Sequence, residues 1–350
     1  MNPEENLTII IVNWNGKHLL KNCLDSISKQ TYKKFNVILV DNGSNDGSVE
    51  FIEKNFSEIK IIKLKENTGF AYANNLGIKE AFKNRNIKYI ITLNNDTKAD
   101  KDYVKNLVQE VKKDKRIGSL QPKVVNFFEK DRIDSVGMLI YKDCSAMNKG
   151  QKEIDEGQYD KKEEIFGSSA SAALYTRKAL EDTRLKDGEF FDNDYFAYYE
   201  DVDLAWRLRL AGFKSFYIPS SKILHVHSAT GKNYSPFKAF HIHRNQYYNI
   251  IKNLPNVLLA KALFFMPYKY SLLILSVFKN KGPSSNLSKN TNFKNNIFFI
   301  VLKSWKEVFL NLFNLLKKRH RIQKNKKVSN EEIKKWFEKY GANLEDMIYK

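Results

Sequence analysis

Short apolar runs alternate with helical patterns along the first hundred residues. The runs are rich in β-branched and aromatic side chains and have the length of buried strands; they cover residues 7–13, 35–40, 59–64 and 87–93. The segments between them repeat apolar side chains at helical spacing; they cover residues 18–29, 49–55 and 70–82. This alternation predicts an α/β protein with a Rossmann-like, mostly parallel sheet flanked by helices.

The pattern is less regular after residue 100, and the predicted elements are separated by longer loops. We expect three further strands, at residues 133–141, 165–175 and 223–228. We expect three further helices, at residues 103–113, 201–211 and 237–253. A charged loop separates the first two of these strands, and Gly212 follows the second helix, as is common at helix C-termini.

Polar side chains follow the predicted strands. The second strand leads into a loop that begins with Asp41, and the fourth ends in Asn94-Asn95-Asp96-Thr97. Ligands of open α/β sheets bind outside the carboxyl ends of the strands, so we expect Asp41 and Asp96 to approach one cleft. A divalent cation there would take one oxygen from Asp96 and others from a nucleotide diphosphate. The alternative is an ordinary turn with an Asx cap, which the motif alone favours.

Three carboxylates stand within four positions at the start of the helix predicted at 201–211: Glu200, Asp201 and Asp203. Acidic residues are common in a first helical turn because of the helix macrodipole. Three of them exceed what a cap needs, and like charges so close raise one another's pKa unless a cation or sugar hydroxyls lie nearby. The pattern leaves a structural and a functional interpretation open.

Two further stretches also allow two interpretations. The run of small residues at 167–173 would let either a ligand or a packed helix approach the backbone closely. His225 and His227 alternate along a strand and therefore point to opposite faces, so at most one would ligate a given ion. A lone strand histidine is usually structural, but one that faces the same edge as Asp96 would be a metal ligand.

Length and composition narrow the class of protein. The 350 residues allow one large domain or two smaller ones, and 42% hydrophobic residues is typical of a globular protein. Cys23 and Cys144 are too few for a disulfide framework or a metal site, which predicts a reducing compartment. The acidic N-terminus leads into a short apolar run, so we expect no signal peptide and a cytoplasmic protein.

The net charge of +19 is concentrated near the C-terminus. Residues 1–230 contain 36 Lys and Arg against 34 Asp and Glu, whereas residues 231–350 contain 23 against 6. In this basic region, residues 257–278 are marginal for a membrane-spanning helix because they carry two lysines. Residues 297–316 are amphipathic and lead into a lysine-rich flank, which predicts attachment to an anionic membrane surface. Helices buried in a globular subdomain are the alternative.

Several motifs occur together in the order of a known family. They are residues 9–16 (IIIVNWNG), 41–48 (DNGSNDGS), 66–77 (ENTGFAYANNLG), 93–97 (LNNDT), 167–177, 190–212 and 225–230. With these stretches the chain resembles the family-two inverting glycosyltransferases of the GT-A fold, and more closely their rhamnosyltransferase-like branch. The resemblance covers about residues 7–250. Each motif alone is weak, but seven in the family's order are a strong signal.

The resemblance implies a role for individual residues. Those expected to bind the nucleotide and the donor sugar are Asn13, Asn15, Asp41, Asn67, Gly69, Phe70, Asn74 and Asn95. Asp96 would carry most of the coordination of Mg²⁺ or Mn²⁺, since Asn94 stands where the family's metal motif begins with Asp. His225 would make the additional metal or diphosphate contact. Asp201 would be the general base that deprotonates the acceptor hydroxyl. Residues expected at the acceptor site are Gly167, Glu200 and Asp203.

The resemblance also implies substrates and an organisation. It implies transfer of a sugar, with rhamnose as the expected one, from a nucleotide-diphosphate sugar to a saccharide or lipid-linked saccharide during synthesis of cell-surface polysaccharide. Residues 1–230 would form the catalytic domain, with a nucleotide-sugar half at 1–97 and an acceptor half at 98–230. Residues 231–350 would be a basic helical region that attaches the protein to the inner face of the cell membrane.

Two other classes of protein remain as alternatives. A nucleotidyltransferase would share the α/β architecture and the metal, but should have a Gly-rich phosphate loop with a basic residue where this chain has Asn13-Trp14-Asn15-Gly16. A non-catalytic protein that binds membranes or nucleic acid would explain the charge. Nucleic-acid binding would need basic residues and exposed aromatics across the main domain. That domain is close to neutral, so we expect no nucleic-acid partner.

Overall fold

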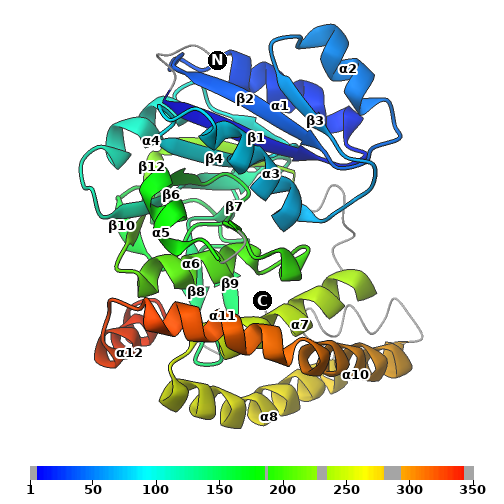
Figure 1. The fold of residues 1–350 in the computed structure, drawn as a ribbon, viewed down its shortest axis with the longest axis vertical. Coiled ribbons are helices and arrows are strands. Elements are labelled where there is room, and N and C mark those ends of the chain that lie inside the picture. Colours follow the sequence, from blue (N-terminus) through cyan, green and yellow to red (C-terminus); the bar gives the residue numbers. More distant parts are fainter. Residues whose placement is uncertain (1–5, 186–187, 227–234, 280–292, 343–350) are drawn as a thin grey trace.

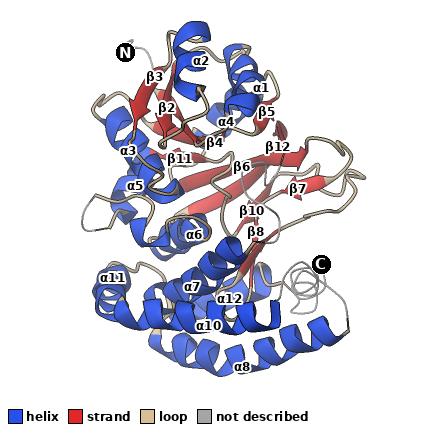
Figure 2. Cartoon of the chain, turned by 90° about the vertical axis from the view of Figure 1, so that its right-hand side faces the viewer, coloured by secondary structure: helices blue, strands red, loops and turns tan. Residues whose placement is uncertain are grey.

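The structure, a computed structural model, describes residues 6–185, 188–226, 235–279 and 293–342. Its centre is a ten-stranded sheet with helices on both faces, and further helices lie at the lower end in Figure 1. The strand order is β10-β12-β6-β11-β4-β1-β2-β3, with β5 paired to β12 and β7 paired to β6. A separate two-stranded ribbon consists of β8 and β9. Figure 2 shows the same arrangement from the side.

The first half of the sheet is parallel, as the pattern predicted. Its strands are β1 (Leu7–Asn13), β2 (Phe35–Asp41), β3 (Lys60–Lys63) and β4 (Tyr89–Asn94). The helices between them are α1 (Lys17–Ser28), α2 (Ser48–Asn55) and α3 (Phe70–Phe82). The predicted boundaries of these elements are confirmed to within two residues.

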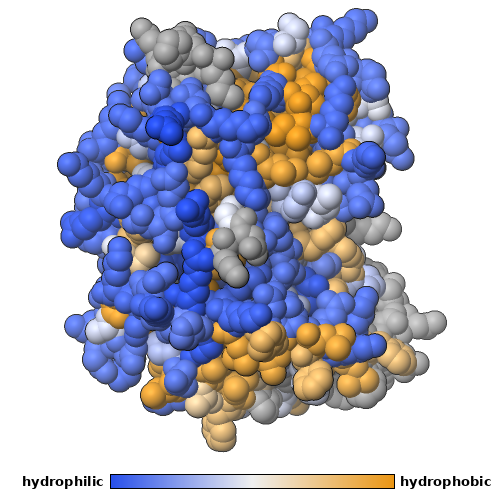
Figure 3. Space-filling view, in the orientation of Figure 1, coloured by the Kyte–Doolittle hydropathy of each residue, from blue (hydrophilic) through white to orange (hydrophobic). Residues whose placement is uncertain are grey.

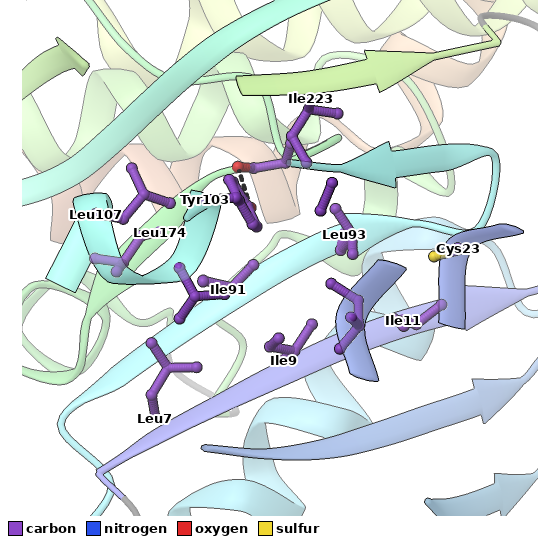
Figure 4. Close-up of a cluster of buried hydrophobic side chains, with 14 of the residues drawn as sticks. Leu7, Ile9, Ile11, Cys23, Ile91, Leu93, Tyr103, Leu107, Leu174 and Ile223 are labelled. Atoms are coloured by element: carbon purple, nitrogen blue, oxygen red, sulfur yellow. Dashed lines mark hydrogen bonds between the residues drawn. The ribbon is translucent and has the colours of Figure 1, made fainter. Parts of the chain in front are cut away.

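Both faces of this half are buried, which explains its continuous apolar runs. On β1, Leu7, Ile9 and Ile11 pack with side chains of α1 and of α4 (Tyr103–Val111) (Figure 4). Ile10 points to the other face and packs with α3. All four side chains are 0% exposed. Burying one such side chain contributes about 1.5–3 kcal/mol to the free energy of folding. β1 therefore stabilises the packing of helices on both faces of the sheet.

The second half of the sheet differs from the prediction. Two long strands, β6 (Ile117–Asn126) and β12 (Lys214–His225), pair in parallel, and only the end of β12 was predicted. β6 lacks a simple apolar pattern because polar side chains are buried along it. Ser119 hydrogen-bonds to Ser215 at 2.8 Å, and Lys123 is paired with Asp155 at 2.8 Å. Residues 227–230, including His227, lie outside the described residues.

The other strands of this half are short. They are β5 (Thr97–Ala99), β7 (Ile133–Ser135), β8 (Met138–Ile140), β9 (Ala146–Asn148), β10 (Glu163–Ile165) and β11 (Leu174–Thr176). The strands predicted at 133–141 and 165–175 are therefore wrong in extent. Gly137, at φ 132°, separates β7 from β8. β11 runs antiparallel to both β4 and β6, which makes the sheet mixed but mostly parallel.

Helices complete the fold. Those near the sheet are α5 (Arg177–Thr183), the short 3₁₀ helix η1 (Asn193–Tyr195) and α6 (Glu200–Leu210). The C-terminal helices are α7 (Pro236–Asn253), α8 (Asn256–Phe278), α10 (Phe293–Leu310), α11 (Leu312–Lys324) and α12 (Asn330–Lys339). α7 contacts α6, α10 and α11, and Trp336 of α12 packs on Phe166 and Trp206. Within the described residues, every helix is too short or too polar to cross a bilayer.

Candidate active site

Polar side chains at the ends of neighbouring parallel strands form one hydrogen-bonded chain. We call the loops after β1, β2 and β4 the carboxyl edge. Asn95 donates to Oδ1 of Asn13 at 2.7 Å, and Asn13 donates to Oδ1 of Asp41 at 3.2 Å. Asn13 and Asp41 are also partners in the register of β1 and β2. The prediction that these polar loops share one edge of the sheet is confirmed.

The loops after β1 and β2 are joined into one unit. The backbone N–H of Asn15 donates to Oγ of Ser44, and Oδ1 of Asn15 accepts from the N–H of Asn45, both at 2.9 Å. Gly16 is required beside them, because a Cβ at this position would lie 2.2 Å from Nδ2 of Asn95. Gly16 and Ser44 were not singled out from the sequence, although both lie inside its motifs.

The loop before α3 meets the chain that precedes α6. Asn67 accepts from the N–H of Gly69 at 3.0 Å and fixes a turn in which Gly69 has φ +87°. A Cβ on Gly69 would lie 2.5 Å from the carbonyl oxygen of Phe196, and that oxygen accepts from the N–H of Ala71 at 3.2 Å. Phe70 follows at the start of α3 and is partly exposed. The predicted donor loop therefore borders the loop that leads to Asp201.

Two neighbouring asparagines of α3 have different partners. Asn74, predicted to line the donor site, is 1% exposed and donates to the carbonyl of Phe70 within its own helix. Asn75 instead accepts from the N–H groups of Phe190 and Phe191 and donates to the carbonyl of Phe191, at 2.7–3.0 Å. These contacts give Asn75 the role of holding the distant loop. The position of Asn75 in the sequence did not predict these contacts.

Asp96 and His225 lie side by side at the carboxyl edge. Oδ1 of Asp96 is 3.1 Å from Nε2 of His225, and the other ring nitrogen, Nδ1, is 2.6 Å from Oδ2 of Asp134. All three side chains are at most 8% exposed. Burial alone would lower the pKa of His225, but the hydrogen bonds and charges of Asp134 and Asp96 outweigh it and raise this pKa to about 10.

The donor set of Asp96 and His225 fits a divalent cation. One carboxylate oxygen and one imidazole nitrogen face each other, and a second carboxylate on the far ring nitrogen is the usual surrounding of a metal-bound histidine. Within the described part of the chain, no group of three or more His, Cys, Asp or Glu is arranged to hold a metal ion. A cation on these two residues would therefore take its remaining ligands from substrate or water.

Asp201 is the second residue of α6 and is partly exposed. Its Oδ2 accepts from the N–H of Ala170 at 3.1 Å, and its Oδ1 accepts from the N–H of Val202 at 2.8 Å. Burial raises the pKa of Asp201, and the two backbone hydrogen bonds limit the increase. A carboxylate that is fixed in place, reachable and more basic than usual is suited to accept a proton.

A short backbone path connects Asp201 to the carboxyl edge. The N–H of Ala170 binds Asp201, and the carbonyl of the next residue, Ser171, accepts from the N–H of Asn94 at 2.8 Å. Asn94 is two residues from Asp96. The loop at 167–173 thus contacts both predicted catalytic regions.

The neighbouring carboxylates of α6 face the interior. Asp203 is 0% exposed and lies 2.8 Å from both Arg207 and Lys252. Glu200 is 6% exposed, and burial together with the charge of Asp201 raises its pKa well above the usual value. A direct contact between Asp203 and an acceptor does not fit this geometry, and Glu200 lies beside Asp201 almost fully covered.

Gly167 also has a packing role. A Cβ at this position would lie 2.3 Å from Cβ of Ala205 on α6, and the residue is buried. Of the two interpretations of the small-residue run, close packing of a helix fits Gly167. Ser169 and Ser171 in the same run are partly exposed. The predicted contact between Gly167 and an acceptor therefore does not fit the structure.

The segment just before α6 has strained backbone conformations and is held by hydrogen bonds from side chains of α7. Phe196, Tyr198 and Tyr199 have φ values of 62°, 68° and 71°, a conformation that costs free energy in residues other than glycine. Nδ2 of Asn245 on α7 donates to three carbonyls of this segment at 2.7–3.0 Å, and Arg244 donates to two. α7 therefore holds the approach to Asp201 in its strained form.

A buried ionic cluster ties the C-terminal helices to the same segment. Lys252 of α7 contacts Asp192 and lies 2.8 Å from Asp203, while Lys318 of α11 lies 2.5 Å from Asp192 and 2.7 Å from Asp194. Burial alone would raise the pKa of Asp192, but the two lysines lower it below the usual range. Lys318, which the sequence pattern placed in a membrane-facing flank, is an internal partner instead.

Comparison with known proteins gives the family. The family model described as "Glycosyl transferase family 2" matches residues 8–184, about half of the chain. "Glycosyltransferase GlyA" of Streptococcus pneumoniae is 34% identical over 111 residues, which are 31% of this chain and 15% of that protein. Poly-beta-1,6-N-acetyl-D-glucosamine synthase of Staphylococcus aureus is 24% identical over 219 residues, which are 61% of this chain and 48% of the synthase. The matches thus span less than half of either relative.

Solved structures have the same fold. GalNAc-T7 with UDP, GalNAc and Mn²⁺ superposes with a TM-score of 0.54 at 15% identity, over 71% of this chain and 48% of that chain. The mannosyltransferase PcManGT from Pyrobaculum calidifontis, in complex with GDP-Man and Mn²⁺, superposes with a TM-score of 0.53 at 16% identity, over 91% and 88%. These structures show that the fold is GT-A. The family match over residues 8–184 shows that the chain belongs to glycosyl transferase family 2.

Proposed function

We propose that this protein is an inverting glycosyltransferase that moves a sugar from a nucleotide-diphosphate donor to a hydroxyl of a saccharide or lipid-linked saccharide. The observation that carries the proposal is the position of Asp201. It is partly exposed at the start of α6 and is linked through Ala170 and Ser171 to the loop that bears Asp96. An acceptor base and a diphosphate site need such neighbouring positions.

The carboxyl edge would bind the nucleotide. Asn13 and Asp41 are nearly fully buried and bonded to each other, so they would shape the loops on which the nucleotide rests. Asn15, Asn67 and Phe70 keep partly exposed side chains for direct contacts. Two solved structures of the same fold contain UDP or GDP-Man, which supports a nucleotide at this edge.

Asp96 and His225 would hold a divalent cation. When bound, the cation neutralises charge that develops on the leaving diphosphate. The nitrogen ligand favours Mn²⁺ over Mg²⁺, which prefers oxygen ligands. Two structural neighbours were crystallised with Mn²⁺.

Asp201 would take the proton of the acceptor hydroxyl as that oxygen attacks the anomeric carbon of the donor. A single displacement with one base inverts the anomeric centre, whereas a double displacement needs a second carboxylate as nucleophile. Glu200 and Asp203 are poor candidates for that nucleophile, since Glu200 is buried with a raised pKa and Asp203 is paired with Lys252. This contrast supports inversion.

The C-terminal helices would contact an anionic membrane that carries the acceptor. Large apolar side chains are exposed on three of these helices, and Figure 3 shows apolar residues gathered at the lower end of the molecule, where these helices lie. The most exposed are Phe264 (86%), Phe309 (76%) and Phe313 (72%) on α8, α10 and α11. Replacing these three by serine should abolish binding to anionic liposomes. Binding that persists would contradict this surface.

Incubation with a panel of UDP-, GDP- and dTDP-sugars and lipid-linked acceptors, followed by mass spectrometry, tests the function. One glycosylated acceptor with an inverted anomeric linkage is expected. Rhamnose as the transferred sugar stays a prediction of the resemblance. Transfer of the nucleotide instead of the sugar would favour the nucleotidyltransferase alternative, and a retained linkage would contradict the single displacement.

A further inference from the structure

Asp134 has no place in any motif of the sequence, yet it contacts the candidate metal site. It belongs to β7, which pairs antiparallel with residues 124–125 of β6, and the other edge of this part of β6 pairs with the end of β12. Its side chain is 7% exposed, and its Oδ2 is 2.6 Å from Nδ1 of His225. The two residues are 91 positions apart, so only the fold brings them together.

We infer that Asp134 is a positioning residue for the metal site: it accepts the Nδ1 proton of His225 and so keeps Nε2 turned toward Asp96. This inference rests on the proposed function, because it presumes a cation between His225 and Asp96. Asp134 itself points to the opposite ring nitrogen and is not a ligand.

The physical reason lies in the two tautomers of imidazole. A neutral histidine carries one N–H, and only the other nitrogen has a lone pair for a metal. A carboxylate that accepts from Nδ1 selects the tautomer with the lone pair on Nε2, and it also fixes the rotation of the ring. Without Asp134, the ring would lose both constraints. Loss of such a partner typically weakens metal binding by about 10-fold to 100-fold.

Metal binding by the full chain tests the inference without sugar transfer. Mn²⁺ is titrated alone and with UDP or GDP, and the free ion is measured by electron paramagnetic resonance. Asp134→Ala should weaken Mn²⁺ binding about 10-fold to 100-fold. Asp134→Asn, which keeps an uncharged acceptor, should cost about 3-fold to 10-fold. Asp131→Asn is the matched control, since this exposed residue precedes β7 and loses the same charge.

A double-variant comparison separates positioning from a merely structural role. If Asp134 acts through His225, Asp134→Ala should have no further effect on Mn²⁺ affinity in a His225→Gln background. Full additivity, or an Asp134→Ala affinity within about threefold of the wild type, would overturn the inference. If Asp134→Ala does not fold, Asp134→Asn replaces it in the test. An Mn²⁺ affinity of Asp134→Asn equal to that of the wild type would then overturn the inference. A wild-type chain that binds no Mn²⁺ under any condition would contradict the proposed metal site itself.

Discussion

The carboxyl edge and the segment before α6 border the same site but are stabilised by different contacts. The carboxyl edge relies on neutral amides between adjacent loops, such as Asn95 to Asn13 and the backbone N–H of Asn45 to Asn15. The segment before α6 relies on buried charges from remote helices, above all Lys252 and Lys318. Losing a neutral hydrogen bond costs about 0.5–1.5 kcal/mol, whereas an unpaired buried charge costs about 3–5 kcal/mol.

This difference gives the C-terminal region a second role. The sequence pattern presented it as a membrane-attaching extension, with buried helices as the alternative. The structure supports the alternative for α7, α11 and α12, whose inner faces pack against α6 and the segment before it. Large apolar side chains are exposed on α8, on α10 and on the outer face of α11. The C-terminal helices therefore help to hold the segment that precedes Asp201.

The largest expected effect on stability is at Lys252. Lys252→Met would leave the fully buried Asp192 and Asp203 short of a cation, so the free energy of unfolding should fall by about 3–5 kcal/mol. Chemical denaturation measures the change. Lys261→Met on the exposed side of α8 is the control and should change it by less than about 0.5 kcal/mol. Equal changes in the free energy of unfolding for the two substitutions would contradict the proposal that the ionic cluster stabilises the fold.

A smaller, pH-dependent effect is expected at Glu164. Burial alone would raise its pKa, but Arg209, with Tyr340 and Lys339 of the C-terminal region, lowers it to about 2. The folded pKa lies below the unfolded value of about 4.3. The stabilisation that ionised Glu164 contributes is therefore present above pH 4.3 and is lost as the pH falls toward 2. Glu164→Gln should lower the free energy of unfolding by about 2 kcal/mol at pH 7, less than the full shift implies because the side chain is partly exposed, and should give a flatter acid profile. An unchanged profile would count against this link to α12.

The smallest effect on stability is expected at the carboxyl edge. Asn95→Ala removes the donor to Oδ1 of Asn13, which should cost about 1 kcal/mol of unfolding free energy. KM for the donor should rise several-fold, because the loops that are proposed to bind the nucleotide lose the hydrogen bond between them. A cost as large as that of Lys252→Met would erase the contrast between the two regions.

The parallel half of the fold was predictable because its strands are buried on both faces and carry continuous apolar runs. β6 and the first part of β12 were missed because Ser119 and Lys123 of β6 and Ser215 of β12 are buried with polar partners, which hides the apolar pattern. The loops of the carboxyl edge were predictable, since polar motifs after parallel strands meet at one edge. The roles of Asn75 and Asp134 were not, because their partners lie 115 and 91 residues away.

The central claim is that Asp201 takes the acceptor proton, and one variant tests it most directly. Transfer by Asp201→Asn should fall by about 10²-fold to 10⁴-fold, while its affinity for the nucleotide diphosphate stays within about threefold of the wild type. Asp182→Asn, a carboxylate of α5 paired with Lys178, is the control and should retain transfer. Near-normal turnover by Asp201→Asn with intact nucleotide binding would contradict the account.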